Sequence, residues 1–202
     1  MKSLLQSKKG AIELSVGTIV IIVLGMTMLI LGLILVRQIF SVATTSIDTL
    51  NEKVTDEINK RLGEEQGNIM VLVSGGGNVA RAKSGAGDFR VAIGARTLDG
   101  SETNRARLQY RLSLSPPNGK SCIDAKNLGE QRTIDLFKTP LNKQNSFDEF
   151  KGDKAYGLVE INIPSGTASC TQKVLIDVTD TKTGQSVGGS FFILEIVKGG
   201  FF

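Results

Sequence analysis

The chain has 202 residues, of which 41% are apolar and 22% charged, and its formal net charge at pH 7 is +4. It contains no histidine and two cysteines, Cys122 and Cys170, which lie far apart in the sequence. These counts exclude Ser-His-Asp and Cys-His catalytic sets, zinc or iron sites that need imidazole, four-cysteine metal sites and Cys-x-x-Cys redox pairs.

The first element is an uncharged apolar run over residues 14–36, bounded by Glu13 and Arg37. As a helix this run would be roughly 35 Å long, which is enough to cross the ~30 Å hydrocarbon layer of a bilayer. We therefore predict a transmembrane helix over residues 11–37. Lysines precede the run and acidic residues follow it from Asp48 onward. The positive-inside rule then predicts a single-pass protein of the cell membrane, with a cytoplasmic N-terminus and an extracytoplasmic C-terminal domain.

The net positive charge belongs mostly to the N-terminal segment. Residues 38–202 carry 20 basic and 19 acidic side chains, so the rest of the chain is nearly neutral. A nucleic-acid-binding surface would need a concentrated basic patch. No nucleic-acid partner is predicted.

Residues 1–10 are the predicted leader, and three interpretations of it are open. A conventional signal peptide has an apolar core of about 7–15 residues, which is shorter than this run. An uncleaved anchor is the second interpretation. The third rests on the motif KKGAIEL, which resembles the class III signal peptides of archaeal type IV pilins and archaellins. The resemblance implies that a prepilin-peptidase-like protease cuts between Gly10 and Ala11, with Lys8 and Lys9 as the basic flank and Glu13 at mature position three.

Two features of the apolar run bear on assembly. The carboxylate of Glu13 lies at the edge of the run, where an unpaired charge is energetically costly. The new amino terminus of a neighbouring subunit would pair with it. The alternative is that Glu13 lies among the lipid headgroups, where the cost is small. Small residues also recur every seven positions, and such a stripe lets helices approach closely, although glycine is common in membrane helices in any case. The predicted assembly residues are Glu13, Thr18, Gly25 and Gly32, and the stripe begins at Ala11.

Residues 38–65 are predicted to form an amphipathic helical stalk. Its apolar stripe has spacings of three and four residues: Ile47, Leu50, Val54, Ile58 and Leu62. No proline interrupts residues 11–62, and Gly63 suits a helix end, so we expect one continuous helix of roughly 75 Å. A long helix that carries a globular head is also the plan of a pilin subunit. The alternatives are a stalk that packs on its own head domain and a short coiled coil.

Residues 66–202 are predicted to form the exported head. Apolar and polar residues alternate in five runs, with turn sequences between them: 89–94, 108–114, 159–163, 174–178 and 192–196. Seven or eight short strands without intervening amphipathic helices indicate an antiparallel sandwich. The stretch over 156–197 resembles the final strands of an immunoglobulin-like surface module, which implies an architecture and no activity. The predicted fold class is therefore a long N-terminal α-helix followed by an all-β antiparallel sandwich.

Both cysteines lie in the head, on the side of the membrane where disulfides persist. We therefore predict a disulfide between Cys122 and Cys170. Two unrelated buried thiols are the alternative.

Three other patterns give weak signals for a site. Residues 75–80 match Gly-x-Gly-x-x-Ala, but Ser84-Gly85-Ala86-Gly87 breaks the chain where a dinucleotide fingerprint needs a helix. The second is an acidic cluster, typical of a solvated loop: Asp148, Glu149 and Asp153. The third is an arginine cluster, typical of a solvated strand face or a contact patch: Arg105, Arg107 and Arg111. No catalytic, cofactor-binding or metal-ligating residue is predicted, and no cofactor.

The sequence as a whole favours a type IV pilin-like, membrane-anchored structural subunit or minor component of an extracellular filament. Its partners would be the membrane, a prepilin-peptidase-like protease and like subunits or related filament proteins. The alternative is a single-pass anchored immunoglobulin-like binding or accessory (stator-like) protein. An enzyme is not expected, because no catalytic set is visible. The mature N-terminus discriminates between the first two: a chain that starts at Ala11 supports the pilin-like route.

Overall fold

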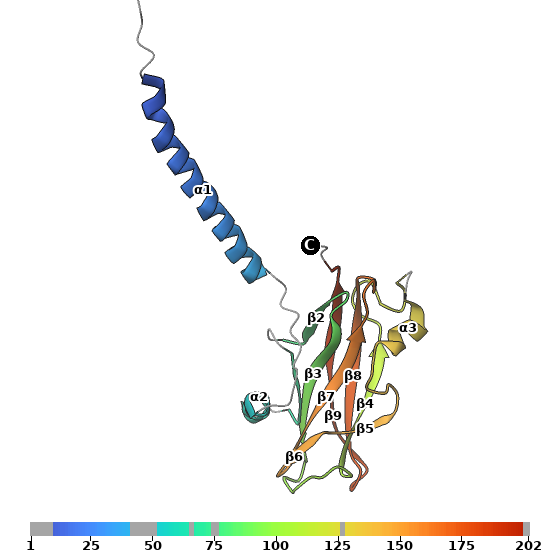
Figure 1. Cartoon of the computed structure of the whole chain (residues 1–202). Coiled ribbons are helices and arrows are strands. Elements are labelled where there is room, and N and C mark those ends of the chain that lie inside the picture. The colour runs from blue at the N-terminus through green and yellow to red at the C-terminus, as the bar shows by residue number, and fades with distance from the viewer. Residues whose placement is uncertain (1–9, 41–51, 65–66, 74–76, 126–127, 200–202) are drawn as a thin grey trace, which may run out of the picture. The chain divides into compact units, whose positions relative to one another are not determined.

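The computed structural model describes residues 10–40, 52–64, 67–73, 77–125 and 128–199, and within the first range it describes side chains over 17–32. The chain divides into two compact units, residues 1–43 and residues 44–202. Of the described elements, the first unit contains helix α1 and the second contains the other helices and the strands (Figure 1).

Helix α1 spans Gly10–Phe40. Its side chains over 17–32 are apolar or small and carry no charge, and the absence of proline allows an unbroken helix. In the part of the chain that the structure describes, no helix is both long and apolar enough to cross a membrane. This finding contradicts the transmembrane helix predicted over 11–37 and the predicted single-pass localisation in the cell membrane.

The prediction of one long N-terminal helix is also wrong. Helix α1 ends at Phe40 and belongs to the first unit, whereas helix α2 spans Glu52–Glu64 and belongs to the second. Ile47 and Leu50 of the predicted stripe lie outside the described residues. The physical reason for the difference is that α2 can bury its apolar stripe against the surface of the sandwich, whereas a free stalk would leave the stripe exposed.

The stripe of α2 packs on the outer face of one sheet. Ile58 and Leu62 are 0% and 1% exposed and form a small cluster with Met70, Ala92 and Tyr156. The Tyr156 hydroxyl donates a hydrogen bond of 2.6 Å to Asn59 Oδ1. This bond helps to fix the position of α2 on the sheet. The structure therefore takes the alternative in which the amphipathic segment packs on its own head.

Gly94 of strand β3 makes this close packing possible. A Cβ atom at this position would lie 2.3 Å from Ile58 Cγ2, a distance that heavy atoms do not reach. We expect Gly94→Ala to lower the free energy of unfolding by about 1–3 kcal/mol, because overpacking forces α2 away from the sheet. Urea unfolding measures this, with Gly67→Ala as control, since a Cβ there meets only an ordinary contact at 3.6 Å.

A double-mutant cycle tests the contact itself. Ile58→Ala removes the methyl group that would clash with the new Cβ of Gly94→Ala. Gly94→Ala should therefore lower the free energy of unfolding by less in the Ile58→Ala background. Strictly additive free energies would show that the cost of Gly94→Ala arises elsewhere.

The second unit is a sandwich of two sheets with α2 and a short helix, α3 (Gly129–Asp135), outside them (Figure 1). The first sheet has the order β1-β3-β7-β6, with β1 Ile69–Leu72, β3 Gly87–Arg96, β7 Lys154–Ile163 and β6 Glu149–Lys151. The second has the order β2-β9-β8-β4-β5, with β2 Val79–Lys83, β9 Gln185–Val197, β8 Cys170–Asp180, β4 Leu108–Ser115 and β5 Gln144–Ser146.

The five alternating runs of the sequence are the five long strands β3, β4, β7, β8 and β9. In β8, for example, Val174, Ile176 and Val178 are fully buried between the sheets while the residues between them are not. Period-two burial of this kind fixes strand register, because a slip by one residue would turn the apolar set outward. The pairing is antiparallel except that β2 runs parallel to β9, so the predicted all-antiparallel arrangement is wrong at that edge.

Candidate functional site

The surface of α1 is the most unusual feature of the described chain. Its large apolar side chains are all between 51% and 75% exposed: Ile19, Val20, Ile21, Ile22, Val23, Leu24, Met26, Met28, Leu29, Ile30 and Leu31. They occupy every side of the helix rather than one face. A helix that is apolar all round is stable only when other apolar groups surround it. The helix is therefore a candidate surface for association with other molecules.

The small residues of α1 form a stripe along this surface. Thr18, Gly25 and Gly32 are seven positions apart, so successive members are displaced by only about 20° around the helix. A Cβ atom at Gly25 or Gly32 would meet nothing within 4 Å in the described chain, so the space above both glycines is open. The structure thus brings together three of the four predicted assembly residues on a face that a second helix could approach closely.

The other predicted processing and assembly residues are described less fully. Gly10, Ala11 and Glu13 belong to α1 by their backbone, but their side chains lie outside the described residues. The basic flank, Lys8 and Lys9, lies outside them as well.

Cys122 and Cys170 form the predicted disulfide, with a Cα–Cα distance of 4.9 Å. Both residues are buried. The bond joins the segment after β4 to the first residue of β8, and two backbone hydrogen bonds support the junction: Cys122 N to Thr171 O at 3.1 Å and Thr171 N to Lys120 O at 2.9 Å. The bridge holds a connection without regular structure against the second sheet.

The arginine cluster of the sequence separates in the structure. Strand β4 begins at Leu108, so Arg105 and Arg107 precede it, and only Arg111 lies on its solvated face. Arg107 is 6% exposed; its Nε and Nη2 atoms donate hydrogen bonds of 2.9 and 2.8 Å to Asp180 Oδ2. Nη2 also donates to both carboxylate oxygens of Asp99 at 2.8 Å. Arg107 therefore fixes the 97–107 segment to the end of β8 and is not part of a contact patch.

This network makes stability depend on pH. The hydrogen bonds from Arg107 hold the pKa of Asp180 and of Asp99 below their usual range. A carboxyl group whose pKa is lower in the folded chain contributes stability that is complete above its unfolded pKa of about 3.9 and is lost as the pH falls through the folded value. We expect Asp99→Asn to lower the melting temperature at pH 7 by a few degrees and to flatten its fall between about pH 4 and pH 2.

Thermal unfolding measured across that pH range checks the prediction. Asp124→Asn is the matched control, because Asp124 is exposed and forms no ion pair in the described part of the chain. Equal acid profiles for Asp99→Asn and the unsubstituted protein would show that the Arg107 network does not set this dependence.

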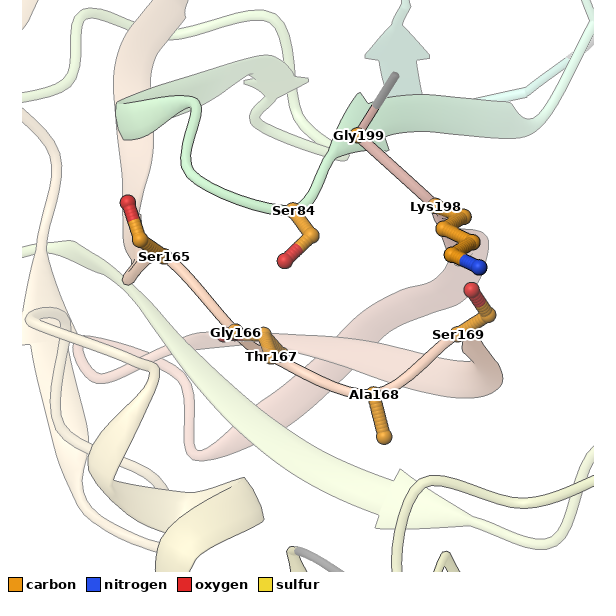
Figure 2. A pocket seen from close by; sticks show the side chains of 8 residues that line it. All are labelled: Ser84, Ser165, Gly166, Thr167, Ala168, Ser169, Lys198 and Gly199. Atoms are coloured by element: carbon orange, nitrogen blue, oxygen red, sulfur yellow. The ribbon is translucent and has the colours of Figure 1, made fainter. Parts of the chain in front are cut away.

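A cavity of about 420 Å³ lies where β2, β7 and β9 end, beside the turn that leads into β8. Figure 2 shows Ser84 pointing into it, with the side chains of Lys198 and Ser169 directed toward one another across its rim. Ser165, Gly166, Ser169 and Lys198 are exposed and the other lining residues are half-buried. The lining residues belong to turns and strand ends, and Lys198 is the one charged residue among them. The cavity therefore does not indicate a class of ligand or a reaction.

The remaining patterns of the sequence take no part in a site. Asn78 is followed directly by strand β2 rather than by a helix, which removes the structural context of a dinucleotide fingerprint. Gly75 and Gly76 lie outside the described residues. Among the residues that are described, no group of three or more acidic or cysteine side chains could hold a metal ion, and this includes Asp148, Glu149 and Asp153.

No family model and no curated protein matches the chain. Among solved structures it is similar to the ASH/PapD-like domain of human CEP192, with 10% identity, a TM-score of 0.40, and coverage of 65% of this chain and 84% of that chain. It is similar to the CARDB domain of a Pyrococcus furiosus protein in complex with di-metal ions, with 12% identity, a TM-score of 0.34, and coverage of 65% and 94%. It is also similar to a family 123 glycoside hydrolase from Clostridium perfringens, with 14% identity and a TM-score of 0.32, over 60% of this chain and 23% of that chain. None of these similarities is evidence of a shared activity.

Proposed function

We propose that this chain is a type IV pilin-like structural subunit, or a minor component, of an extracellular filament, and that it acts by assembly rather than by catalysis. The observation that carries the proposal is the exposure of the apolar side chains of α1 on all sides of the helix. Covering a large aliphatic side chain contributes about 1.5–3 kcal/mol, so a helix with many of them associates strongly with similar helices.

Like copies of α1 are the partners that this surface fits best. An apolar helix without charge over 17–32 gives no directional polar contact that would select an unrelated protein. Identical helices, in contrast, supply both sides of such a contact: the small-residue stripe of one copy, where Gly25 and Gly32 leave room for a neighbouring backbone, and a different apolar side of the next copy. Repetition of a head-to-tail contact of this kind builds a helical filament.

The leader motif provides the second support. In this proposal a prepilin-peptidase-like protease removes residues 1–10 by cutting between Gly10 and Ala11, with Lys8 and Lys9 as its basic recognition flank. The cut creates a positively charged amino terminus at Ala11. That charge is a partner for the Glu13 carboxylate of a neighbouring subunit, which would otherwise be buried unpaired in the filament core.

The disulfide supports an extracellular place for the filament. Disulfides persist in oxidising compartments and are rare in the cytosol of most organisms. The Cys122–Cys170 bridge is buried in the sandwich, and the described residues contain no other cysteine.

The experiment that tests this proposal is a mass measurement of the mature N-terminus. When the full chain is produced together with a prepilin peptidase, we expect a product that begins at Ala11. Gly10→Leu should prevent the cut, because the protease needs a small residue at that position, and Thr27→Leu should be cut normally. An unprocessed chain that keeps residues 1–10 in the presence of an active peptidase would contradict the proposal.

A second candidate is an immunoglobulin-like binding or accessory (stator-like) protein of a filament machine. It is favoured by a polar groove in the sandwich, described below. The two candidates give different results after processing: a structural subunit forms polymers of its own, whereas an accessory protein is recovered with a filament made of other subunits.

A further inference from the structure

A polar groove opens between the two sheets at the edge of the sandwich formed by β5. Its volume is about 480 Å³, and its lining comes from β4 and β5 of one sheet, from β7 of the other, and from residues 138–140. The residues that carry the argument are Arg105, Tyr110, Lys138, Asn145, Asp148 and Glu160. The volume is within the range of about 300–1,000 Å³ that is typical of small-molecule sites.

Tyr110 forms the floor of this groove. The residue is only 3% exposed, and its ring packs on Phe147 with 5.0 Å between the ring centroids. Within the described part of the chain its hydroxyl has no hydrogen-bond partner, in contrast to that of Tyr156, which donates to Asn59. Burial, followed by the charges of Asp148 and Glu160, raises the pKa of Tyr110, so the phenol keeps its proton and remains a donor. Tyr110 lines the groove, and its hydroxyl is not among the fully buried atoms that lack a partner, so a group bound in the groove can accept a hydrogen bond from it.

The charged groups around the floor are balanced. Two cations, Arg105 and Lys138, line the groove together with two carboxylates, Asp148 and Glu160. The carboxylates are held in place from outside the groove: Leu158 N donates to Asp148 Oδ2 at 2.8 Å and Arg90 Nε donates to Glu160 Oε1 at 2.9 Å. Each carboxylate has further lone pairs available to a ligand.

This combination selects one class of ligand. A phosphate or nucleotide site would need an excess of positive charge, and an apolar ligand would leave the carboxylates and the phenol unpaired. A neutral polyhydroxylated molecule uses all of the groups, because each of its hydroxyls both donates and accepts. Pro140 and Leu158 also line the groove, and their apolar atoms are available to the C–H face of a sugar ring.

We propose that this groove binds a neutral carbohydrate of about one or two sugar rings, with the Tyr110 hydroxyl and the Asp148 carboxylate bonding its hydroxyls at the floor and Arg105 and Asn145 bonding it at the rim. Carbohydrate binding of this kind goes beyond the proposed role in assembly, because the head would bind a ligand without any contribution from α1.

The test uses the purified full chain on an array of neutral mono- and disaccharides of glucose, galactose, mannose and N-acetylglucosamine, with sialylated and sulfated glycans and a phosphopeptide as further probes. The sugar that binds is then titrated by calorimetry. We expect millimolar or tighter binding to a neutral sugar. Free sugar and the same sugar attached to a protein, tested as separate arms, distinguish a soluble ligand from a surface glycan.

Tyr110→Phe and Tyr156→Phe form a matched pair of variants, because each removes one hydroxyl from one of the two tyrosines of the chain. Tyr110→Phe should weaken sugar binding by at least tenfold without lowering the melting temperature, because the lost hydroxyl has no partner in the described chain. Tyr156→Phe should lower the melting temperature and leave binding unchanged, because it breaks the bond to Asn59. Absence of binding to every neutral sugar, equal binding by Tyr110→Phe, or a preference for the acidic glycans or the phosphopeptide would overturn the proposal.

Discussion

Filament assembly is expected to stop when Gly25 and Gly32 are both replaced by leucine. The two positions lie on one stripe of α1, and the space above each is open in the described chain. Each leucine would fill the space into which the backbone of a neighbouring helix is proposed to fit, so the helices could no longer approach closely. The substitutions keep the helix apolar and favour helix formation, because leucine has a higher helix propensity than glycine. A failure to assemble could therefore not be attributed to loss of α1.

The measurement is the amount of polymer in sheared surface material, judged by electron microscopy and by sedimentation, and we expect it to fall below a tenth of the level without substitutions. Thr27→Leu is the control. Thr27 lies two positions after Gly25, about 200° around the helix, so it faces away from the stripe. Its hydroxyl donates a hydrogen bond of 2.9 Å to the Leu24 carbonyl of its own helix. Normal assembly of the double glycine variant would show that the stripe is not the contact between subunits.

Removal of the disulfide is expected to produce the largest loss of stability in the sandwich. The bridge closes a loop over a sequence separation of 48 residues. In the chain-entropy model, a crosslink of that span stabilises the folded state by about 4 kcal/mol, because it restricts the unfolded chain. Cys122→Ala with Cys170→Ala should therefore lower the free energy of unfolding by about that amount, in a protein whose total stability is on the order of 5–15 kcal/mol.

Urea unfolding with and without a reductant separates the crosslink from the side chains. The reductant should destabilise the unsubstituted protein and leave the double alanine variant unchanged. If the variant and the oxidised protein unfold at the same urea concentration, the bridge contributes nothing to stability. A small residual effect is expected from packing alone, since Cys122 is fully buried.

The long strands could be predicted from the sequence because their apolar residues alternate over five or more positions. The short strands β1, β2, β5 and β6 have between three and five residues each, which is too few for a period to be visible. Their positions depend on partners far away in the sequence: β2, for example, lies beside the C-terminal strand β9. No local pattern contains this information.

The helical part of the prediction failed for a different reason. The stripe of α2 is visible in the sequence, but the sequence alone does not say which surface covers it. Gly94 is the deciding residue, because a glycine in the middle of a strand allows Ile58 to approach the sheet. A glycine inside an alternating run is a signal for close approach of another element, and this signal could have indicated that α2 packs on its own head.

The candidate sites also differ in how well the sequence reveals them. The disulfide could be predicted from two cysteines assigned to one exported domain, and the small-residue stripe from residue type and spacing. The roles of Arg107 and Tyr110 could not, because Arg107 pairs with an aspartate 73 positions away and Tyr110 meets the carboxylates of β7 and of the segment after β5 only in the folded sandwich. Both residues belong to patterns that suggest exposed or ordinary core positions.

The central claim is that α1 is the element through which copies of this chain assemble, and electron cryomicroscopy of filaments sheared from producing cells tests it most directly. The proposal predicts a helical filament whose subunit begins at Ala11, whose core consists of packed α1 helices, and in which Gly25 and Gly32 face a neighbouring helix. Filaments that lack this chain, or that contain it with α1 outside the contacts between subunits, would contradict it.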